Sequence, residues 1–330
     1  MSELSYLEKL LDGVEVEWRN LGDTSLFEIA NNGRKPVKAS LRIAGETPYY
    51  GANNIQDYVD GYTHDGEYVL IAEDGSASLE NYSIQYATGK FWANNHVHVV
   101  RGKERVHSRF LYHYLCIVNF LPFLTGGGRA KLTKGQLIEI PVPIPCPDNP
   151  EKSLAIQSEI VRILDKFTAL TAELTAELNM RKKQYNYYRD RLFSFGAHDV
   201  KRLKLGELCV IGDGLHGTPE YDANGDYFFI NGNNLGYQKI SFNDNTKKVN
   251  DSMFKKHGIH FDPINTVFLS INGTIGNVSF YNNEKIVLGK SVAYFKIKSP
   301  ELHTRYLFYF LQTNYAKQYF ENQKTGSTIK

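Results

Sequence analysis

Short apolar runs, bounded by clusters of Gly, Asn and Asp, predict β-strands in both halves of this chain. The clearest predicted strands are residues 68–72, 96–100, 267–271 and 292–297. Each half also contains one aromatic, helix-like run, and these runs are residues 108–120 and 304–320. Strands followed by a helix in each half predict a mixed α/β (α+β) fold with two similar domains.

A segment with a period of seven residues separates the two halves. Asn149 is suited to cap a helix and Pro150 to occupy its first position, and neither Pro nor Gly recurs before Gly196. The apolar seam positions are Ile160, Leu164, Phe167, Leu174, Leu178, Tyr185, Tyr188 and Leu192. Such a seam is typical of a long helix that packs against another helix, with an ordinary buried helix as the alternative. About 40 helical residues would span roughly 60 Å.

The two halves also resemble each other in sequence. WRNLGD near residue 18 matches RLKLGE near residue 202, and YYGANNI at 49–55 matches FINGNNL at 229–235. Further matches, in the same order, pair residues 66–76 with 265–275, 108–115 with 304–311, and 125–131 with 324–330. Collinear matches predict an internal duplication. We therefore expect a first domain at 1–147, a central helix at 148–198 and a second domain at 199–330.

Composition is consistent with two globular domains. The chain has 330 residues, of which 42% are hydrophobic and 22% charged, which excludes global disorder. Its three cysteines form no CxxC motif, so we expect reduced thiols in a cytoplasmic protein. The acidic N-terminus is unlike a signal peptide, and the longest apolar stretch, residues 110–124, is too short to cross a bilayer. We expect no membrane association.

Charge is distributed unevenly along the chain. The net charge is only +2, but residues 1–150 carry 14 basic and 18 acidic side chains, and residues 199–330 carry 16 and 12. Residues 151–198 carry 8 basic and 6 acidic side chains. Contacts with a polyanion such as DNA would therefore use local basic patches, which the second half and the helix supply more readily.

No motif predicts catalysis. Gly289-Lys290-Ser291 lacks the upstream glycine of a phosphate-binding loop, because position 284 is Glu. His96 and His98 alternate on a predicted strand, but no third metal ligand stands at a suitable spacing, and a packing role is favoured. We expect no catalytic residues, no metal site and no cofactor in this chain.

Polar and aromatic loop residues recur in both halves and are the candidate DNA contacts. Asn suits bidentate pairing with adenine, Arg and Lys pair with guanine, and Ser, Thr and Tyr can hold phosphates. Asn and Gly are also common turn residues, so a purely structural role stays open for each. The candidates are Tyr49, Tyr50, Asn53, Asn54, Asn94, Asn95, His96, Arg129, Lys131, His216, Thr218, Tyr221, Asn231, Asn233, Asn234, Asn272, Lys290, Ser291, Ser327 and Thr328.

Several stretches resemble the DNA-specificity subunit of type I restriction–modification systems. They include VEWRNLGD near the start, PYYGANNIQDYVDGY and GKFWANNHVHVV in the first half, and LTAELNMRKKQYNYYRDRLFSF at 174–195, which is the most specific. The second half is similar through VKRLKLGELCVIGDGLHGTPEY, VFLSINGTIG and KTGSTIK. The resemblance covers essentially the whole chain.

The resemblance implies a non-catalytic subunit with two target-recognition domains, each reading one half of a split DNA sequence. It implies a central helix that sets the spacing and docks modification subunits, which bind S-adenosylmethionine and methylate adenine, while a restriction subunit cleaves DNA. Family members are expected to have a second long helix after the second domain, whereas this sequence stops at GSTIK. We therefore expect the seam to pair between two chains or with a modification subunit. An inactive fragment, or an unrecognised nuclease or methyltransferase, is the alternative.

Overall fold

The computed structural model describes residues 6, 9–126, 130–196 and 200–323. By its internal contacts the chain divides into two compact units, residues 1–174 and 175–330, and the division falls inside a long helix. Each unit is described by itself below. The predicted fold class, two similar α/β domains joined by a long helix, is confirmed. The finer domain boundaries stay a prediction.

The first unit consists of short strands with few helices. Its strands are β1 (Val16–Asn20), β2 (Phe27–Ile29), β3 (Ala44–Tyr50), β4 (Ile55–Val59), β5 (His64–Asp65), β6 (Tyr68–Ala72), β7 (Ile84–Ala87), β8 (Lys90–Ala93), β9 (Val97–Gly102) and β10 (Pro141–Pro145). Its helices are α2 (Ser108–Leu115), α3 (Lys134–Leu137) and the short 3-10 turns Asn31–Gly33, Ala39–Leu41 and Leu121–Phe123.

A four-stranded antiparallel sheet, in the order β2-β9-β6-β7, forms the centre of the first unit. Every residue of β6 is buried, because one face of the sheet packs against α2 and the other against the sheet β4-β3-β8-β5. Strands β1 and β10 form a separate antiparallel pair that adds Val142 and Ile144 to the core. Burial of one such aliphatic side chain contributes about 1.5–3 kcal/mol to folding.

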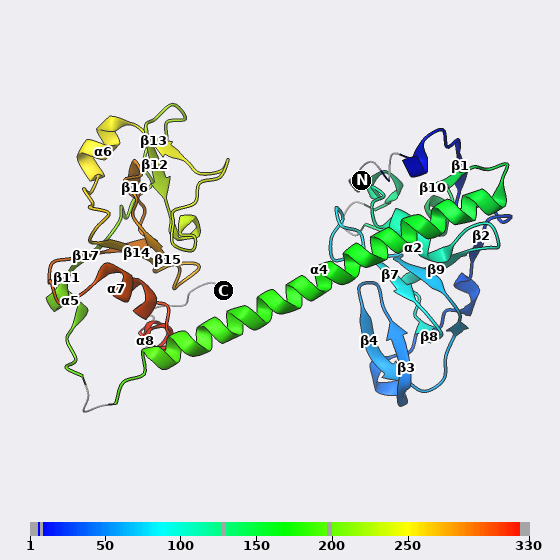
Figure 1. Ribbon diagram of the computed structural model, residues 1–330, viewed down its shortest axis with the longest axis horizontal. Coiled ribbons are helices and arrows are strands. Elements are labelled where there is room, and N and C mark those ends of the chain that lie inside the picture. Colours follow the sequence, from blue (N-terminus) through cyan, green and yellow to red (C-terminus); the bar gives the residue numbers. More distant parts are fainter. Residues whose placement is uncertain (1–5, 7–8, 127–129, 197–199, 324–330) are drawn as a thin grey trace. The chain divides into compact units, whose positions relative to one another are not determined.

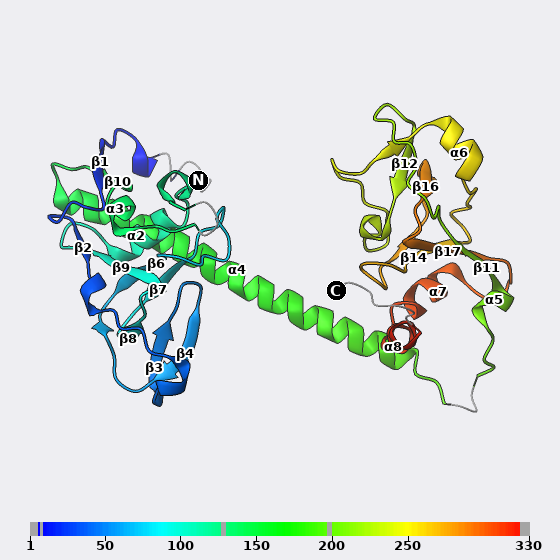
Figure 2. The same ribbon diagram turned by 180° about the vertical axis from the view of Figure 1, so that it is seen from behind.

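Helix α2 connects the sheet to the long helix. Its amphipathic sequence buries Phe110, Leu111 and Leu115, and the Nδ1 atom of His107 caps it by accepting from the backbone N–H of Arg109. Helix α2 lies against β6, β7 and β9 and against the first half of helix α4 (Figures 1 and 2).

The second unit has a similar set of elements. Its strands are β11 (Cys209–Asp213), β12 (Tyr227–Ile230), β13 (Lys248–Val249), β14 (Thr266–Ser270), β15 (Val278–Phe280), β16 (Ile286–Leu288) and β17 (Val292–Ile297). Its helices are α5 (Leu205–Leu208), α6 (Asp251–His257), α7 (Thr304–Phe310), α8 (Asn314–Asn322) and the 3-10 turn Gly232–Asn234.

The strand order confirms the internal duplication. The four-stranded sheet of the second unit has the order β11-β17-β14-β15, and that of the first has the order β2-β9-β6-β7. In both sheets the strand that comes first along the chain pairs with the strand that comes last, and the last strand also pairs with the second. Parallel pairing of β12 with β16 repeats that of β3 with β8. Helix α7 packs on β14 and β15, and His303 caps it through Nδ1 as His107 caps α2. Duplicated sequence therefore produces duplicated topology.

Helix α4 (Pro150–Leu192) is the long green helix of Figure 1. The predicted start is confirmed, because Pro150 is its first residue and the Asn149 Oδ1 accepts from the N–H of Lys152 at 3.0 Å. The predicted end at Gly196 is wrong by several residues. The helix ends at Leu192, where the side chain of Phe193 packs against Tyr306 and Phe310 of α7.

Both aromatic runs form shorter helices than the sequence predicts. The first ends at Leu115 instead of Phe120, and Pro122 follows in a 3-10 turn. The second is interrupted between Phe310 and Asn314, because the Thr313 hydroxyl accepts from the N–H of Ala316 and starts a new helix. Local side-chain capping, which apolar periodicity does not report, decides these ends.

Candidate nucleic-acid interface

The ends of β6 and β9 define a polar edge of the first unit. Ala72 lies opposite Val97, so the residues that follow β6 and those that precede β9 leave the sheet side by side. The N–H of Glu73 donates to the carbonyl of His96 at 2.8 Å. We call Glu73, Asp74, Asn95, His96 and Lys131 the first polar edge.

Glu73 holds this edge together. Its carboxylate, 15% exposed, accepts from Arg34 Nη1 at 2.6 Å and lies 3.0 Å from Lys131 Nζ. Burial alone would raise the pKa of Glu73, but the hydrogen bonds from Arg34 and Lys131 outweigh it and keep the pKa below its usual value. The backbone of Lys131 pairs with Asp74 and with Thr125. Lys131 is therefore fixed beside the end of β6.

Asp74 and His96 form an exposed pair on this edge. The His96 Nδ1 lies 2.6 Å from the Asp74 Oδ1, with 48% and 36% of the side chains exposed. The His96 N–H donates to the buried Asn94 Oδ1 at 2.8 Å, which fixes the backbone below the ring. The pair thus presents one imidazole to solvent from a fixed position.

Asn53 ties a second loop to the same edge. Its Nδ2 donates to the carbonyl of Gly75 at 2.8 Å, and its Oδ1 accepts from the N–H of Ala77 and the hydroxyl of Ser83. The turn between β3 and β4, which carries the exposed Asn54, therefore lies beside the loop after β6. The fold thereby brings four separate segments of the chain to one region, with residues 53–54, 74, 96 and 131.

Three predicted DNA contacts are buried, which corrects the sequence expectation for them. Tyr49 is 1% exposed and its hydroxyl bonds to the backbone of Val37, while Asn94 is 4% exposed and caps His96. Asn234, 5% exposed, is bonded to Asn231, Ser241 and Thr246. A buried side chain whose polar atoms are satisfied inside the fold does not reach a base edge, so these residues have structural roles.

Tyr50 is half-buried, and its ring packs edge-on against Phe91. Burial raises the pKa of Tyr50. Arg129, Ser327 and Thr328, which were also predicted to contact DNA, lie outside the described residues.

The second unit brings together an equivalent set, which we call the second polar edge: Asn231, Asn272, Lys290 and Ser291. The Ser291 hydroxyl donates to the Asn231 Oδ1 at 3.1 Å and accepts from the N–H of Gly232 at 2.9 Å. The N–H of Ile271 donates to the carbonyl of Ser291, as Glu73 donates to His96 in the first unit. Lys290 and Asn272 are exposed, whereas Asn231 and Ser291 are half-buried.

His216 joins this edge through its backbone. Leu215 forms a bridge with Gly289, so the loop that carries His216 lies beside Lys290. The His216 Nε2 lies 2.6 Å from the Asp213 Oδ2, with 71% of the His216 side chain exposed. Thr218 and Asn233 are exposed, and Tyr221 rests its ring against Phe229.

Four charged residues at these sites were not predicted from the sequence: Glu73 and Asp74 belong to the first polar edge, Arg34 pairs with Glu73, and Asp213 pairs with His216. The fold itself does not require an acidic pair after this strand, because the second half has Ile271 and Asn272 at the equivalent positions. The signal that could have found them is antiparallel pairing, since the end of one predicted strand must meet the start of its partner. His98, by contrast, is buried, with Nε2 against the Leu132 carbonyl and Nδ1 against Asn31, in keeping with the packing role favoured for it.

The predicted helix seam is exposed on α4. Leu164, Phe167, Leu174, Leu178, Tyr185, Tyr188 and Leu192 are 39–73% exposed, and Ile160 is half-buried. Burial and a hydrogen bond with Tyr237 raise the pKa of Tyr185 to about 12. Apolar residues repeated at this spacing on one exposed face are typical of a surface that packs against another helix.

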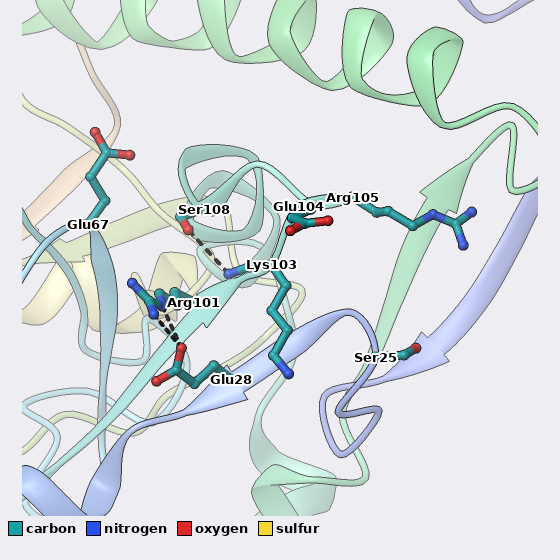
Figure 3. Close-up of a pocket in the computed structure, with 9 residues that line it drawn as sticks. Ser25, Glu28, Glu67, Arg101, Lys103, Glu104, Arg105 and Ser108 are labelled. Atoms are coloured by element: carbon teal, nitrogen blue, oxygen red, sulfur yellow. Dashed lines mark hydrogen bonds and ion pairs between the residues drawn. The ribbon is translucent and has the colours of Figure 1, made fainter.

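A hollow of about 560 Å³ lies in the first unit, and none of its lining residues, drawn in Figure 3, belongs to the first polar edge. Three cations, Arg101, Lys103 and Arg105, line it together with three glutamates, so their charges balance. Arg101 pairs with Glu28 at 2.6 Å, and Lys103 and Arg105 donate to the backbone carbonyls of Thr24 and Pro147. Because its three glutamates balance its three cations, this hollow is not favoured as a phosphate site.

In the described part of the chain no helix has the length and apolar character that a bilayer span requires. Nor do the described residues gather three or more His, Cys, Asp or Glu side chains in an arrangement suited to a metal ion.

The sequence is similar to that of one family of known proteins. The family described as "Type I restriction modification DNA specificity domain" matches residues 14–181 and again 198–330. A Haemophilus influenzae protein with the inferred role of a type I restriction enzyme specificity subunit is 45% identical over 318 residues, which cover 93% of this chain and 78% of that protein. The type I restriction enzyme EcoprrI specificity subunit of Escherichia coli is 40% identical over 250 residues, covering 66% of this chain and 60% of its own length.

A solved structure has a similar fold. The type I restriction–modification S subunit from M. genitalium matches with a TM-score of 0.56 at 13% identity, covering 95% of this chain and 81% of that one. Two matched domains, a long helix between them and these close relatives lead to one conclusion: the chain belongs to the family of type I restriction–modification DNA specificity subunits.

Proposed function

We propose that this chain reads a bipartite DNA sequence, with one half-site for each domain, and that partner subunits carry out the chemistry. The observation that carries the proposal is the duplicated polar edge: each unit brings a Gly- and Asn-rich turn, the end of one strand and the start of its partner to one region. Two similar DNA-recognition domains in one chain would suit two half-sites at a fixed separation, as the two subunits of dimeric DNA-binding proteins do.

Contacts to DNA divide into two kinds in this proposal. The exposed Lys131 and Lys290 are suited to phosphates, which set affinity but not sequence. Asn54, His96, Asn233 and Asn272 carry the donors and acceptors that base edges require. In this proposal the protein meets its DNA target in the cytoplasm, which is the location that the sequence predicts.

Helix α4 is the proposed docking element for modification subunits. Its exposed seam offers apolar side chains that a partner helix would cover, and its two halves are attached to their own units by Asp165 and by Asp190. In the proposal the modification subunits bind S-adenosylmethionine and extrude and methylate the target adenine, whose amine is otherwise stacked inside the duplex. A restriction subunit would complete the complex.

The test is co-expression of this chain with its modification subunit, affinity purification of the complex, and methylation of random-sequence DNA read by sequencing. A complex that methylates adenine in a split motif supports the proposal and identifies the target. A complex that forms but does not methylate would support an inactive docking fragment instead. Absence of any complex would contradict the proposed docking role.

A second candidate is favoured by the exposed seam alone. Two copies of the chain could pair through Leu164, Phe167, Leu174 and Leu178, which are all at least 39% exposed. Analytical ultracentrifugation of the chain without partners tests this, because pairing between copies gives a dimer whose fraction rises with concentration. A strictly monomeric chain that still binds the modification subunit would exclude it.

A further inference from the structure

Asp74 and His96 lie on the exposed first polar edge, joined by a bond of 2.6 Å between Oδ1 and Nδ1. We propose that Asp74 is a positioning residue that fixes the His96 ring so that its other nitrogen, Nε2, reads a base carrying an amino group, cytosine or adenine. This inference rests on the proposed function, namely that the chain reads DNA.

The pair is attached to a rigid base. Asp74 follows β6 and His96 precedes β9, two neighbouring strands whose paired ends, Ala72 and Val97, are fully buried. The Glu73 N–H to His96 carbonyl bond and the His96 N–H to Asn94 bond hold both backbones. A side chain that reads a base needs such preorganisation, because a loose ring loses rotamer entropy on binding and discriminates poorly.

Hydrogen-bond chemistry determines what the exposed nitrogen can recognise. An ionised carboxylate only accepts hydrogen bonds, so the Nδ1 that faces Asp74 carries the proton. In a neutral imidazole the other nitrogen, Nε2, is then an acceptor. The phosphodiester backbone of DNA offers oxygen acceptors and no donor, whereas cytosine N4 and adenine N6 donate in the major groove. A neutral His96 held by Asp74 therefore pairs with a base and not with a phosphate.

Protonation would reverse this preference. In the doubly protonated ring both nitrogens are donors, so Nε2 would favour guanine, thymine O4 and phosphate. Among the described residues, Asp74 is the charged group bonded to the ring, and the neighbouring carboxylate of Glu73 is already paired with Arg34 and Lys131. Asp74 is thus the carboxylate that acts on His96 directly, and base selection at one position should depend on pH.

The second unit provides a matched control. His216 is also paired with an aspartate, Asp213, but through Nε2 and in a loop, with 71% of its side chain exposed. Removal of Asp213 changes a histidine pair of the same kind in the other domain, so it should affect only the other half-site.

The experiment uses the full chain in complex with its modification subunit and the target found by methylation sequencing. Each base pair of both half-sites is replaced in turn, and the affinity for each duplex is measured. The readout is the ratio of affinities between bases at one position, taken at the same pH. It is measured at about pH 5.5 and at about pH 8.5, on the two sides of the general histidine range. The variants are Asp74→Ala, Asp74→Asn, His96→Ala and Asp213→Ala. Tryptophan fluorescence reports folding of the first unit, since Trp18 and Trp92 are the two tryptophans of the chain.

At the higher pH we expect the wild type to favour cytosine or adenine at one base pair by about fivefold, the size of one net hydrogen bond. The ratio should fall towards one at the lower pH, and His96→Ala should abolish it at both. Asp74→Ala should remove most of it, while Asp74→Asn should retain it, because the Asn Oδ1 still accepts from Nδ1. Asp213→Ala should leave this base pair unchanged.

A base preference that Asp74→Ala leaves intact, or that is equal at both pH values, overturns the inference while the proposed function stands. A uniform loss of binding to all sequences in Asp74→Ala also overturns it, since it would indicate a phosphate or folding role. If Asp74→Ala does not fold, Asp74→Asn and the wild-type pH comparison decide. Wild-type complex without any sequence preference contradicts the proposed function itself.

Discussion

The Nε2 atom of His113 in helix α2 lies 2.7 Å from the Oδ1 of Asp165 in helix α4. Arg109, one turn earlier on α2, donates to the same oxygen at 2.9 Å and stacks over the rings of Tyr86 and Tyr112. Burial would raise the pKa of Asp165, but the bonds from Arg109 and His113 outweigh it and lower the pKa. One carboxylate therefore attaches the first half of the long helix to the first unit.

Asp165→Ala should destabilise the first unit by about 1–2 kcal/mol, because it removes two charge-assisted hydrogen bonds and leaves Arg109 and His113 without this partner. Urea unfolding followed by tryptophan fluorescence measures this unit, which contains both Trp18 and Trp92. Asp148→Ala, at an exposed residue just before the helix, is the control. Equal midpoints for the two variants would contradict the role given to Asp165.

Glu73→Gln should weaken the dependence of the free energy of unfolding on pH in acid. The folded-state pKa of Glu73 is lowered, so its contribution is complete above the unfolded-state pKa of about 4.3 and is lost as the pH falls through the lower folded-state value. The difference in unfolding free energy between wild type and variant should be largest at neutral pH and shrink in acid. Urea midpoints from about pH 3 to about pH 7 would show this. A difference that stays constant with pH would exclude it.

The seam can be tested without disturbing either unit. Leu174→Ser with Leu178→Ser changes side chains that are 56% and 53% exposed, so each substitution should alter unfolding by about 0.5 kcal/mol or less. Capture of the co-expressed modification subunit should fall at least about tenfold, since two adjacent seam layers are lost. Met180→Ser, 66% exposed but off the seam, should leave capture unchanged. Full capture by the double variant would show that partners dock elsewhere.

Lys182, Lys183 and Lys290 are exposed cations on the helix and on the second polar edge. Replacement of each by Gln should weaken binding to all DNA sequences alike and reduce the slope of log affinity against log salt by about one. Fluorescence anisotropy with specific and non-specific duplexes over a salt series measures both effects. Lys152→Gln, at the other end of the helix, serves as the comparison. A loss confined to one sequence would instead assign base contacts to these lysines.

The sequence by itself determined the elements whose signals are local. Tyr68–Ala72 and Val292–Ile297 are strands with the predicted bounds, because continuous apolar runs between turn residues have few alternatives. Asn149 and Pro150 start the long helix through their own chemistry. Collinear repeats predicted two similar domains, since equal sequences place equal residues in the core.

Helix ends were decided by contacts that the periodicity does not contain. The Thr313 hydroxyl interrupts an aromatic run that looks continuous in sequence, and Phe193 leaves the helix to pack on α7. In both cases one side-chain interaction ends the helix although the helical propensity of the run is favourable. This is possible because propensity differences are only a few tenths of a kcal/mol per residue.

The candidate interface depended most on tertiary structure. Asn53 and Asn54 are both exposed, yet the Asn53 side chain is bonded to the loop after β6, while Tyr49 and Asn94 are buried. Arg34, Glu73 and Lys131 meet only because strand register places the end of β6 beside the start of β9 and the loop before Leu132. Register is set by the burial of a whole sheet, so residue type shows which side chains can bind DNA, and only the packed fold decides which of them are free to do so.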